Sequence, residues 1–415
     1  MARFATFSLL TLILLALPAG ASAQLSSGES SMSKVLQRQI RAAGSHSGAY
    51  VANATENRGV FRLRADRARI LASNTKLFTT AAALARFGST GRLATTVRGE
   101  GSLEADGTWR GSLYLVGGGD PSFGSTSFGS RNYGGGGAVE DLAAALESVG
   151  IRRVSGRIIG DENAFDTRRG GPSSGYRTSG YVGPLSGLAF NRGLATESGR
   201  GYQSNPAMFA AARLDSALGR RGIDVAVVPR TGDAPAGTTE LAAEQSPEMS
   251  RLSTLTNRPS DNFFAEMLLK ATGLQVDGRG TTAGGARAAT LFARNLGSRP
   301  RIADGSGLSR RNRASPRSVV RLLLGMRRRD ENMAYTNSLA VAGRNGTLRS
   351  RMRRGPARGK CRAKTGTISG VSTLSGYCRA RSGDVYAFSF LMNGVSPSGA
   401  RRIQDRMAQA VAGVR

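Results

Sequence analysis

The sequence predicts an α/β protein of the α+β kind, in which one domain of helices and an antiparallel sheet is interrupted by an inserted, mainly β second domain. Residues 49–63 form two β-like runs that have no neighbouring partners in the sequence. A predicted hairpin and a third strand at 361–392 can supply those partners. Between these ends, short β-like runs alternate with Gly, Ser and Asp, whereas the flanking segments have helical periodicity. The predicted first domain therefore comprises 24–92 and 245–415, and the predicted insert comprises 93–244.

Residues 1–23 have the pattern of a secretory signal peptide. Arg3 gives a positive start, Phe7–Leu17 is apolar, and Ala21-Ser22-Ala23 is an A-x-A cleavage site. The apolar run is shorter than the roughly 20 residues of a membrane span. We therefore expect an exported, soluble protein that is periplasmic or extracellular and associated with the cell wall.

The elements of the first domain follow from periodicity and from helix end signals. A helix is predicted from Ser73 to Phe87, because apolar residues recur along it and Gly88 can end it. Further helices are predicted at 262–271, 318–328 and 400–412, and strands at 361–368, 371–378 and 385–392.

The insert is predicted to contain four β-like runs and one helix, at 139–149. Its tract 117–137 is rich in Gly and Ser, and we expect it to be a loop. A phosphate-binding loop is disfavoured there, because no Gly-Lys-Ser/Thr follows the glycines and no helix opens directly from them.

The composition excludes several kinds of site. The chain holds 58 Lys and Arg against 28 Asp and Glu, a net charge of +30, but only five of the cations are lysines. One His and two Cys cannot build a zinc site of several such ligands, and we expect no metal and no cofactor. The single His46 lies in a Gly/Ser stretch that predicts an exposed loop, which argues against a Ser-His-Asp triad. A site that needs a titratable amine must use one of the few lysines, because Arg stays protonated.

The two cysteines flank the predicted hairpin. A two-residue turn at Ser369-Gly370 places Cys361 and Cys378 opposite each other, at a separation compatible with a disulfide. Export also permits a disulfide. We predict a cross-strand disulfide; two buried free thiols are the alternative.

Three short motifs occur in order: Ser73-Asn-Thr-Lys76, Ser260-Asp-Asn262 and Lys364-Thr-Gly366. This trio is typical of penicillin-binding proteins and class A β-lactamases. Other matches at 31–34 and 130–132 lie in a polar segment and in the Gly-rich tract. The first two motifs of the trio, by contrast, each lead into an apolar helix.

The spacing of the first motif suits nucleophilic catalysis. Ser73 and Lys76 are one helical turn apart and share a face. A serine hydroxyl needs a base, and a neutral Lys76 can serve if burial and a nearby cation, Lys364, lower its pKa. The backbone N–H groups of Ser73 and Thr367 are candidate oxyanion donors.

The third motif suits substrate binding. Gly366 allows a substrate backbone to approach the predicted strand, which can receive an extended peptide. Lys364, Thr365 and Thr367 can bind a terminal carboxylate.

Together these motifs make the sequence resemble the D-alanyl-D-alanine carboxypeptidase/endopeptidase family, the class C low-molecular-mass penicillin-binding proteins (peptidase family S13). The resemblance covers nearly the whole mature chain and implies a penicillin-recognising transpeptidase-like domain with a β-lactamase-like fold and inserted domains. The 183 residues between Lys76 and Ser260 indicate that a second domain is present and a third is reduced or missing. Further matching segments are 72–80, 117–121, 160–166, 304–310 and 346–348.

The resemblance implies a role for each motif residue. Ser73 forms an acyl-enzyme with peptidoglycan stem peptides, and terminal D-Ala leaves. Lys76 is the base, Ser260 relays a proton to the leaving amine, and Asn262 holds Lys76 and the substrate amide. β-Lactam antibiotics are implied as covalent inhibitors that acylate Ser73.

Some family members recognise the D-centre of diaminopimelate in the stem peptide, which is a zwitterion. The resemblance makes Asp120 the candidate carboxylate and Arg310 the candidate cation. A turn-capping Asp and an ordinary surface Arg are the alternative interpretations.

Two other functions stay open. One is a serine β-lactamase-like hydrolase. The other is a non-enzymatic, polycationic protein that binds anionic wall polymers, since a charge of +30 attracts polyanions. No specific nucleic-acid partner is expected, because the cations are scattered and aromatic residues make up only 6%.

Overall fold

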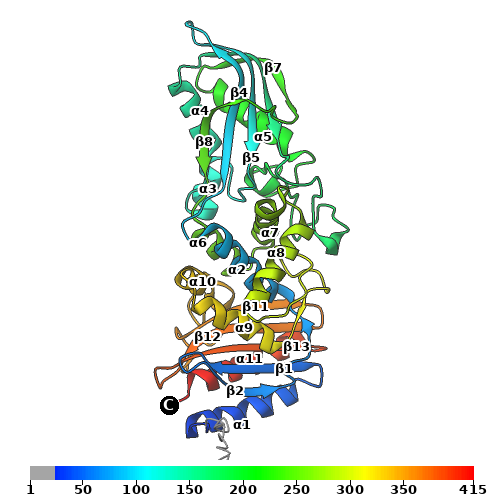
Figure 1. Ribbon diagram of the computed structural model, residues 1–415, viewed down its shortest axis with the longest axis vertical. Helices are drawn as coiled ribbons and strands as arrows, with labels where there is room; N and C mark the ends of the chain where they lie inside the picture. The colour runs from blue at the N-terminus through cyan, green and yellow to red at the C-terminus, as the bar shows by residue number, and fades with distance from the viewer. Residues whose placement is uncertain (1–23) are drawn as a thin grey trace, which may run out of the picture.

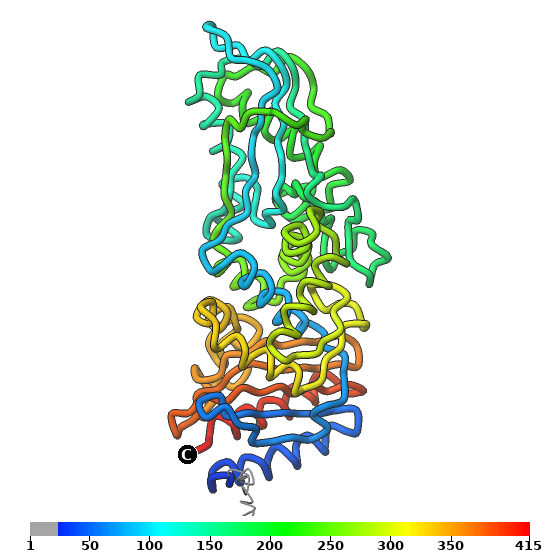
Figure 2. Tube along the Cα trace, viewed as in Figure 1, coloured from blue at the N-terminus to red at the C-terminus, as the bar shows by residue number. Residues whose placement is uncertain are grey.

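The computed structural model describes residues 24–415 as an elongated molecule with two lobes (Figure 1). The predicted signal peptide, 1–23, lies outside the described residues. Figure 2 shows that the beginning and the end of the described chain lie together in the lower lobe, whereas the cyan and green middle of the chain forms the upper lobe. Each lobe has its own sheet, so the predicted mixture of helices and separate sheets is confirmed.

The lower lobe is built on a six-stranded antiparallel sheet of order β10-β11-β12-β13-β1-β2. Strand β1 pairs with β13, so the N-terminal hairpin obtains its partner from the C-terminal strands, as predicted. The strands are β1 (Ser47–Asn53), β2 (Arg58–Leu63), β10 (Ala340–Val341), β11 (Cys361–Ile368), β12 (Val371–Arg379) and β13 (Val385–Asn393), and a separate pair is β3 (Arg69–Ile70) with β9 (Arg313–Ala314).

Helices cover both faces of this sheet. Helices α1 and α11 pack together on one face, and the other face supports a helical layer around α2 (Figure 1). Helix α2 is buried at every residue from Thr75 to Leu84, which is the pattern of a central helix. Its C-cap is Gly88, as predicted. The helices of this lobe are α1 (Ser27–Ala42), α2 (Thr75–Phe87), α6 (Met249–Asn257), α7 (Asn262–Asp277), α8 (Thr282–Asn295), α9 (Pro316–Arg327), α10 (Asn332–Ser338) and α11 (Pro397–Ala412).

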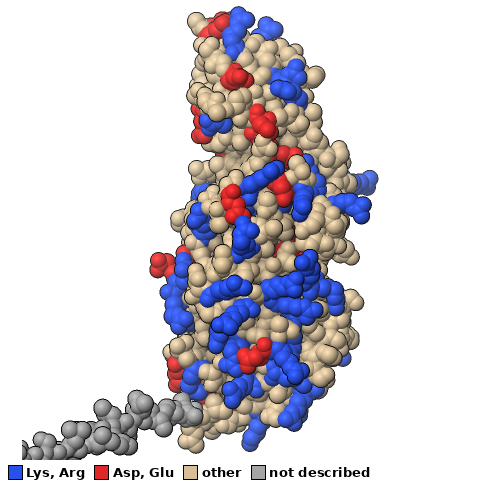
Figure 3. Space-filling model, turned by 45° about the vertical axis from the view of Figure 1, so that its right-hand side comes forward, with Lys and Arg blue, Asp and Glu red and all other residues tan. Residues whose placement is uncertain are grey.

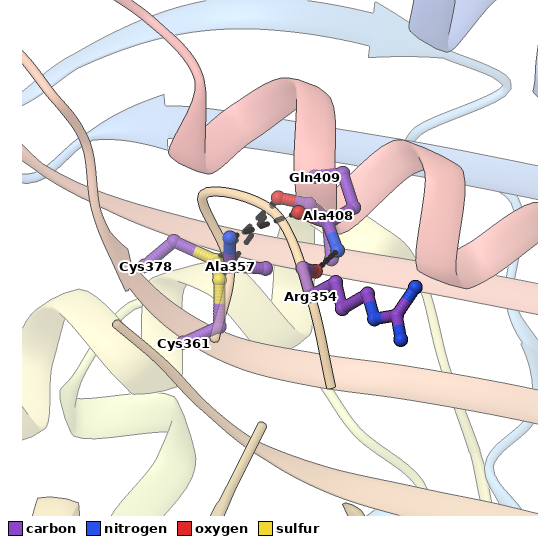
Figure 4. Close-up of a disulfide and its surroundings, with 6 residues drawn as sticks. All are labelled: Arg354, Ala357, Cys361, Cys378, Ala408 and Gln409. Carbon is purple, nitrogen blue, oxygen red and sulfur yellow. Dashed lines mark hydrogen bonds between the residues drawn. A yellow bond between two sulfur atoms is a disulfide. The ribbon is translucent and has the colours of Figure 1, made fainter. Parts of the chain in front are cut away.

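The predicted disulfide is present. Cys361 and Cys378 are opposite each other in the β11–β12 register and are bonded. Both are fully buried against α11, where Gln409 accepts a hydrogen bond from the Ala357 N–H and donates one to the Arg354 carbonyl (Figure 4). The disulfide therefore links β11 to β12 at the end of their hairpin that packs against α11.

The upper lobe has a five-stranded sheet of order β7-β6-β5-β4-β8. The pairs β5–β6 and β6–β7 are parallel, and parallel neighbours require crossover connections, which α4 and α5 supply. The lobe is thus richer in helix than the sequence indicated. The strands are β4 (Ala94–Leu103), β5 (Thr108–Gly117), β6 (Arg153–Asp161), β7 (Asp224–Thr231) and β8 (Thr239–Gln245), and the crossover helices are α4 (Val139–Ser148) and α5 (Pro206–Gly219).

The prediction of a loop throughout 117–137 is wrong in one part. A short helix, α3 (Thr126–Tyr133), lies within it. Ser125 caps its first turn by accepting a hydrogen bond from the Phe128 N–H, and Gly134 ends it in the left-handed conformation. Local capping therefore outweighs the Gly and Ser content of the tract.

Two ion pairs connect the segment between β6 and β7 to α7. Lys270 Nζ lies 2.6 Å from Asp166 Oδ1, and the Lys270 side chain is 0% exposed. Arg192 lies 2.7 Å from Asp261 at the start of α7. Both ion pairs hold the segment that follows β6 against α7, the helix that begins at Asn262 of the second motif.

Among residues 24–415, every helix is too short or too polar to cross a membrane.

Candidate active site

Ser73 lies in a tight turn that the rest of the lower lobe holds in place. The turn is a 3-10 helix, η1 (Ala72–Asn74), which leads directly into α2. Two glycines pack against it, since a Cβ at either Gly307 or Gly366 would lie only 2.9 Å from the Ser73 backbone nitrogen. Asn74 donates a 2.8 Å hydrogen bond to the Lys364 carbonyl, which ties the turn to β11.

Lys76 is fully buried and surrounded by oxygen atoms. Its Nζ lies 2.7 Å from Asn262 Oδ1, 2.7 Å from the Ser306 carbonyl oxygen and 3.3 Å from Ser73 Oγ. A neutral amine has two hydrogens and one lone pair. The two closer oxygens can only accept hydrogen bonds, so they take both hydrogens and leave the lone pair for the Ser73 hydroxyl. This arrangement orients the amine as a base.

Burial also favours the neutral amine. It lowers the pKa of Lys76 to about 8, against the opposite effect of the nearby carboxylates of Asp261, Glu266 and Asp304. The predicted lowering of the Lys76 pKa by the charge of Lys364 is not found. Burial, and after it the charge of Lys76, lower the pKa of Lys364 itself well below its ordinary value. Burial rather than a neighbouring cation is therefore what tunes Lys76.

The second motif forms the start of α7. Asp261 caps the helix by accepting a hydrogen bond from the Phe264 N–H at 2.9 Å. Asn262 accepts from Lys76, and its amide donates a 3.0 Å hydrogen bond to the Tyr181 carbonyl of the insert. Ser260 has a φ of 69°, in a region that residues other than Gly rarely adopt. Such strain is concentrated at functional sites.

The third motif lies on β11, where one edge of the strand is open. In the described residues, β10 pairs with β11 only through Arg362 and Ala363, so the edge beyond Lys364 has no strand partner. Lys364 Nζ donates to the Thr365 carbonyl at 3.0 Å, and Thr365 Oγ1 donates to Thr347 Oγ1 at 2.8 Å. An extended peptide can therefore add to this edge beside Ser73.

Asp120 belongs to the upper lobe and Arg310 to the lower lobe. Asp120 is 2% exposed and accepts hydrogen bonds from the Ser122 N–H and hydroxyl, while its Oδ2 has no partner among the described residues. Burial raises the pKa of Asp120 to about 7. Arg310 is exposed and donates to the Ser369 carbonyl in the β11–β12 turn. Within residues 24–415 no hydrogen bond or ion pair joins them.

Two buried carboxylates that sequence reasoning did not single out hold the carbonyl that binds Lys76. Glu266 accepts hydrogen bonds from the N–H groups of Gly305 and Ser306 at 3.0 and 2.8 Å. Asp304 accepts from the N–H groups of Gly307 and Ser309 at 2.7 and 2.6 Å. The two carboxylates thereby fix the segment from which the Ser306 carbonyl accepts a hydrogen bond from Lys76.

A sequence signal for Glu266 existed. It lies four residues after Asn262 in a stretch, 263–271, whose other residues apart from Lys270 are all apolar. A charged residue on a buried helix face needs partners, and those partners are backbone N–H groups of a distant segment. Only the tertiary structure identifies that segment.

The D-Ala-D-Ala carboxypeptidase 3 (S13) family matches the chain over residues 29–203 and 202–414. The chain belongs to this family. The expected enzyme class, a serine-type D-Ala-D-Ala carboxypeptidase, is therefore confirmed.

Individual relatives support the same assignment for this S13 carboxypeptidase. It is 29% identical over 423 residues to a D-alanyl-D-alanine carboxypeptidase of Actinomadura, covering 82% of this chain and 76% of the relative. It is 30% identical over 353 residues to a carboxypeptidase of Mycobacterium tuberculosis, covering 81% and 74%. The crystal structure of penicillin binding protein 4 from Haemophilus influenzae shares its fold with a TM-score of 0.75 and 19% identity, covering 91% of this chain and 99% of that chain. That protein is also known in complex with a β-lactam, with a TM-score of 0.72 and 18% identity over the same shares.

The pKa of Lys76 predicts the pH dependence of the S13 carboxypeptidase. Only the neutral amine can accept the Ser73 proton, and its pKa is lowered to about 8. We expect kcat/KM for an acetylated peptide ending in D-Ala-D-Ala to rise with pH, about tenfold per unit at pH values well below 8, and then to level off above it. Initial rates between pH 5.5 and 9.5 test this expectation, and a flat profile across that range would contradict it.

Substitution Glu266→Gln tests the support of the Ser306 carbonyl. Glutamine has one acceptor oxygen, so its NH₂ group would face one of the two N–H groups that Glu266 now binds. We expect kcat to fall by about ten- to a hundredfold, on the order of 1.4–2.7 kcal/mol of lost transition-state stabilisation, and the pH midpoint to shift.

The matched control is Glu240→Gln, which changes an exposed acid of the upper lobe. It should leave both kcat and the pH midpoint unchanged. A purely structural role for Glu266 would lower the melting temperature without moving the pH midpoint, and that result would count against the assignment.

Proposed function

We propose that this chain is an exported serine D-Ala-D-Ala carboxypeptidase and DD-endopeptidase that cleaves peptidoglycan stem peptides through an acyl-enzyme on Ser73. The observation that carries the proposal is the position of Lys76 Nζ, 3.3 Å from Ser73 Oγ with both of its hydrogens directed to Asn262 and Ser306. A serine beside a buried, oriented amine is an activated nucleophile.

Acylation begins when Ser73 Oγ attacks the carbonyl carbon of the penultimate D-Ala. Its proton passes to Lys76 Nζ, and the negative charge on the carbonyl oxygen is stabilised by the N–H groups of Ser73 and Thr367. The C–N bond then breaks, and Ser260 relays the proton from Lys76 to the leaving amine. Water later attacks the ester and gives a proton to Lys76; the C–O bond to Ser73 then breaks, and Lys76 returns that proton to Ser73 Oγ as the acyl product leaves.

The open edge of β11 supports binding of an extended peptide. The acyl part would pair with the edge beside Gly366, and the terminal carboxylate would bind Lys364, Thr365 and Thr367. Arg401 of α11 donates to Thr367 Oγ1 at 3.4 Å and adds a cation near that position. Carboxypeptidase and endopeptidase reactions share the acyl donor and differ in the leaving amine, which is free D-Ala or the side-chain amine of a cross-link.

Penicillins would react at the same serine. Their amide carbonyl occupies the position of the scissile carbonyl, and the opened ring keeps the leaving nitrogen attached to the enzyme. The resulting ester is hydrolysed slowly because that group stays where water must attack. The β-lactam complex of the Haemophilus influenzae protein, which shares this fold, is consistent with such binding.

The test is labelling of the purified mature chain with a fluorescent penicillin, followed by intact mass and peptide mapping. We expect one stable adduct, on Ser73, and none in a Ser73→Ala variant of the same thermal stability. Digestion of stem peptides and of cross-linked dimers then separates the two peptidase activities.

The other outcomes of this experiment favour different functions. Rapid turnover of the penicillin would overturn the proposal in favour of a β-lactamase. A well-folded protein without an adduct and without peptidase activity would favour the non-enzymatic wall-binding function.

We also propose that Asp120 and Arg310 bind the zwitterionic end of diaminopimelate in the stem peptide. Three observations support this proposal: Asp120 Oδ2 has no partner among the described residues, Arg310 is exposed, and Arg310 is held at the turn that follows the β11 edge. The carboxylate of Asp120 would bind the ammonium of the substrate, and Arg310 would bind its carboxylate.

Three stem peptides that differ at one side chain test this proposal. They carry diaminopimelate, lysine or norleucine, which present a zwitterion, an ammonium and no charge. Arg310→Gln should lower kcat/KM about tenfold for the diaminopimelate peptide alone. Asp120→Asn should lower it for the diaminopimelate and lysine peptides. Arg313→Gln, at a nearby exposed Arg, is the control, and equal effects on all three peptides would refute the assignment.

A further inference from the structure

The excess of positive over negative charge lies outside the upper lobe. Residues 93–244 hold 15 arginines and 16 acidic residues, a net charge of −1, so the remaining residues carry +31. Figure 3 shows Lys and Arg gathered over the lower lobe, whereas the upper lobe carries both signs. The proposed peptidase uses only a few of these cations. A surface of one sign raises the local concentration of oppositely charged ligands.

One cavity of the lower lobe concentrates this charge. It has a volume of about 450 Å³ and is lined by Arg287, Arg294, Arg301 and Arg311, with no acidic residue in its lining. Arg287 and Arg294 lie two turns apart on one face of α8. The other two arginines belong to the segment that runs from α8 toward α9. Tyr176 of the insert lies at the cavity's edge.

Most of these guanidinium groups lack a counter-ion. Arg287 pairs with Asp277, but within residues 24–415 Arg294, Arg301 and Arg311 form no ion pair. All four side chains are exposed, so they can turn toward a ligand. Bringing like charges together in one concavity costs Coulomb energy, which a bound anion would relieve.

We propose that this cavity binds phosphate groups of a phosphodiester polymer. Guanidinium groups from two walls can surround a tetrahedral phosphate, whereas a single guanidinium fork already satisfies a planar carboxylate. The concave shape suits a polymer strand better than the flat surface of a membrane. Leu291 lines the same cavity and is 50% exposed, which gives the carbon backbone of the polymer an apolar contact.

The cavity lies outside the catalytic groups but close to them in the chain. Ala303 lines it and directly precedes Asp304, while Arg311 follows Arg310. A polymer bound there would hold the enzyme beside its substrate without entering the cleft. The inference does not rest on the proposed peptidase activity, because its readout is binding.

The experiment measures binding of a fluorescently labelled poly(glycerol phosphate), a phosphodiester polymer, to the mature chain at 150 mM NaCl, with poly-L-glutamate of equal charge as the second probe. We expect poly(glycerol phosphate) to bind at least tenfold more tightly than polyglutamate. The variant Arg294→Gln/Arg301→Gln should weaken poly(glycerol phosphate) binding at least tenfold. The variant Arg294→Lys/Arg301→Lys keeps the charge but removes the guanidinium groups, and it should give an intermediate loss of affinity.

The matched control is Arg38→Gln/Arg381→Gln, which removes two exposed arginines elsewhere on the same lobe. It should change the affinity less than twofold. Equal losses in the cavity and control variants, equal binding of both probes, or no binding of poly(glycerol phosphate) would each overturn the proposal. Unchanged melting temperatures confirm that each variant is folded, and Ser73 labelling by penicillin is a separate measurement that neither result affects.

Discussion

The buried amine of Lys76 is the interaction on which the site depends. A lysine at 0% exposure loses its hydration, and only polar partners or loss of its proton can compensate. Here the partners are carbonyl oxygens of Asn262 and Ser306, and they orient the amine toward Ser73. The same burial that makes the group costly to the fold is what brings its pKa to about 8 and makes it useful as a base.

Much of the lower lobe can be understood as support for that amine. Helix α7 contributes both Asn262, which binds Lys76 directly, and Glu266, which holds the backbone of Ser306. Strand β11 holds the turn of Ser73 through Asn74. Three segments that are distant in sequence therefore meet at one nitrogen atom, and a shift in any of them changes the direction of its lone pair.

The two lobes differ in net charge and in what they contribute to the catalytic site. The insert is nearly neutral and contacts the second motif twice: the Tyr181 carbonyl binds Asn262, and Arg192 pairs with Asp261. The lower lobe carries the excess of arginine and both catalytic lysines. Neither a carbonyl nor an arginine changes its charge near neutral pH, so these contacts leave the protonation of the site to Lys76 and its buried carboxylates.

The sequence by itself determined the motifs, their order and much of the lower lobe. The helix after Ser73, the β11–β12 hairpin and the disulfide follow from local signals: apolar periodicity, a Gly stop and a two-residue turn that places two cysteines opposite each other. It also followed that the N-terminal strands pair with C-terminal ones, because unpaired strands at one end needed partners from the other.

Tertiary structure alone decided the rest. Glu266 and Asp304 act through backbone N–H groups, which every residue possesses, so no pattern of side chains predicts which segment they bind. The cause of the lowered pKa of Lys76 is burial by several elements at once, and burial is a property of the assembled core rather than of any segment of the sequence.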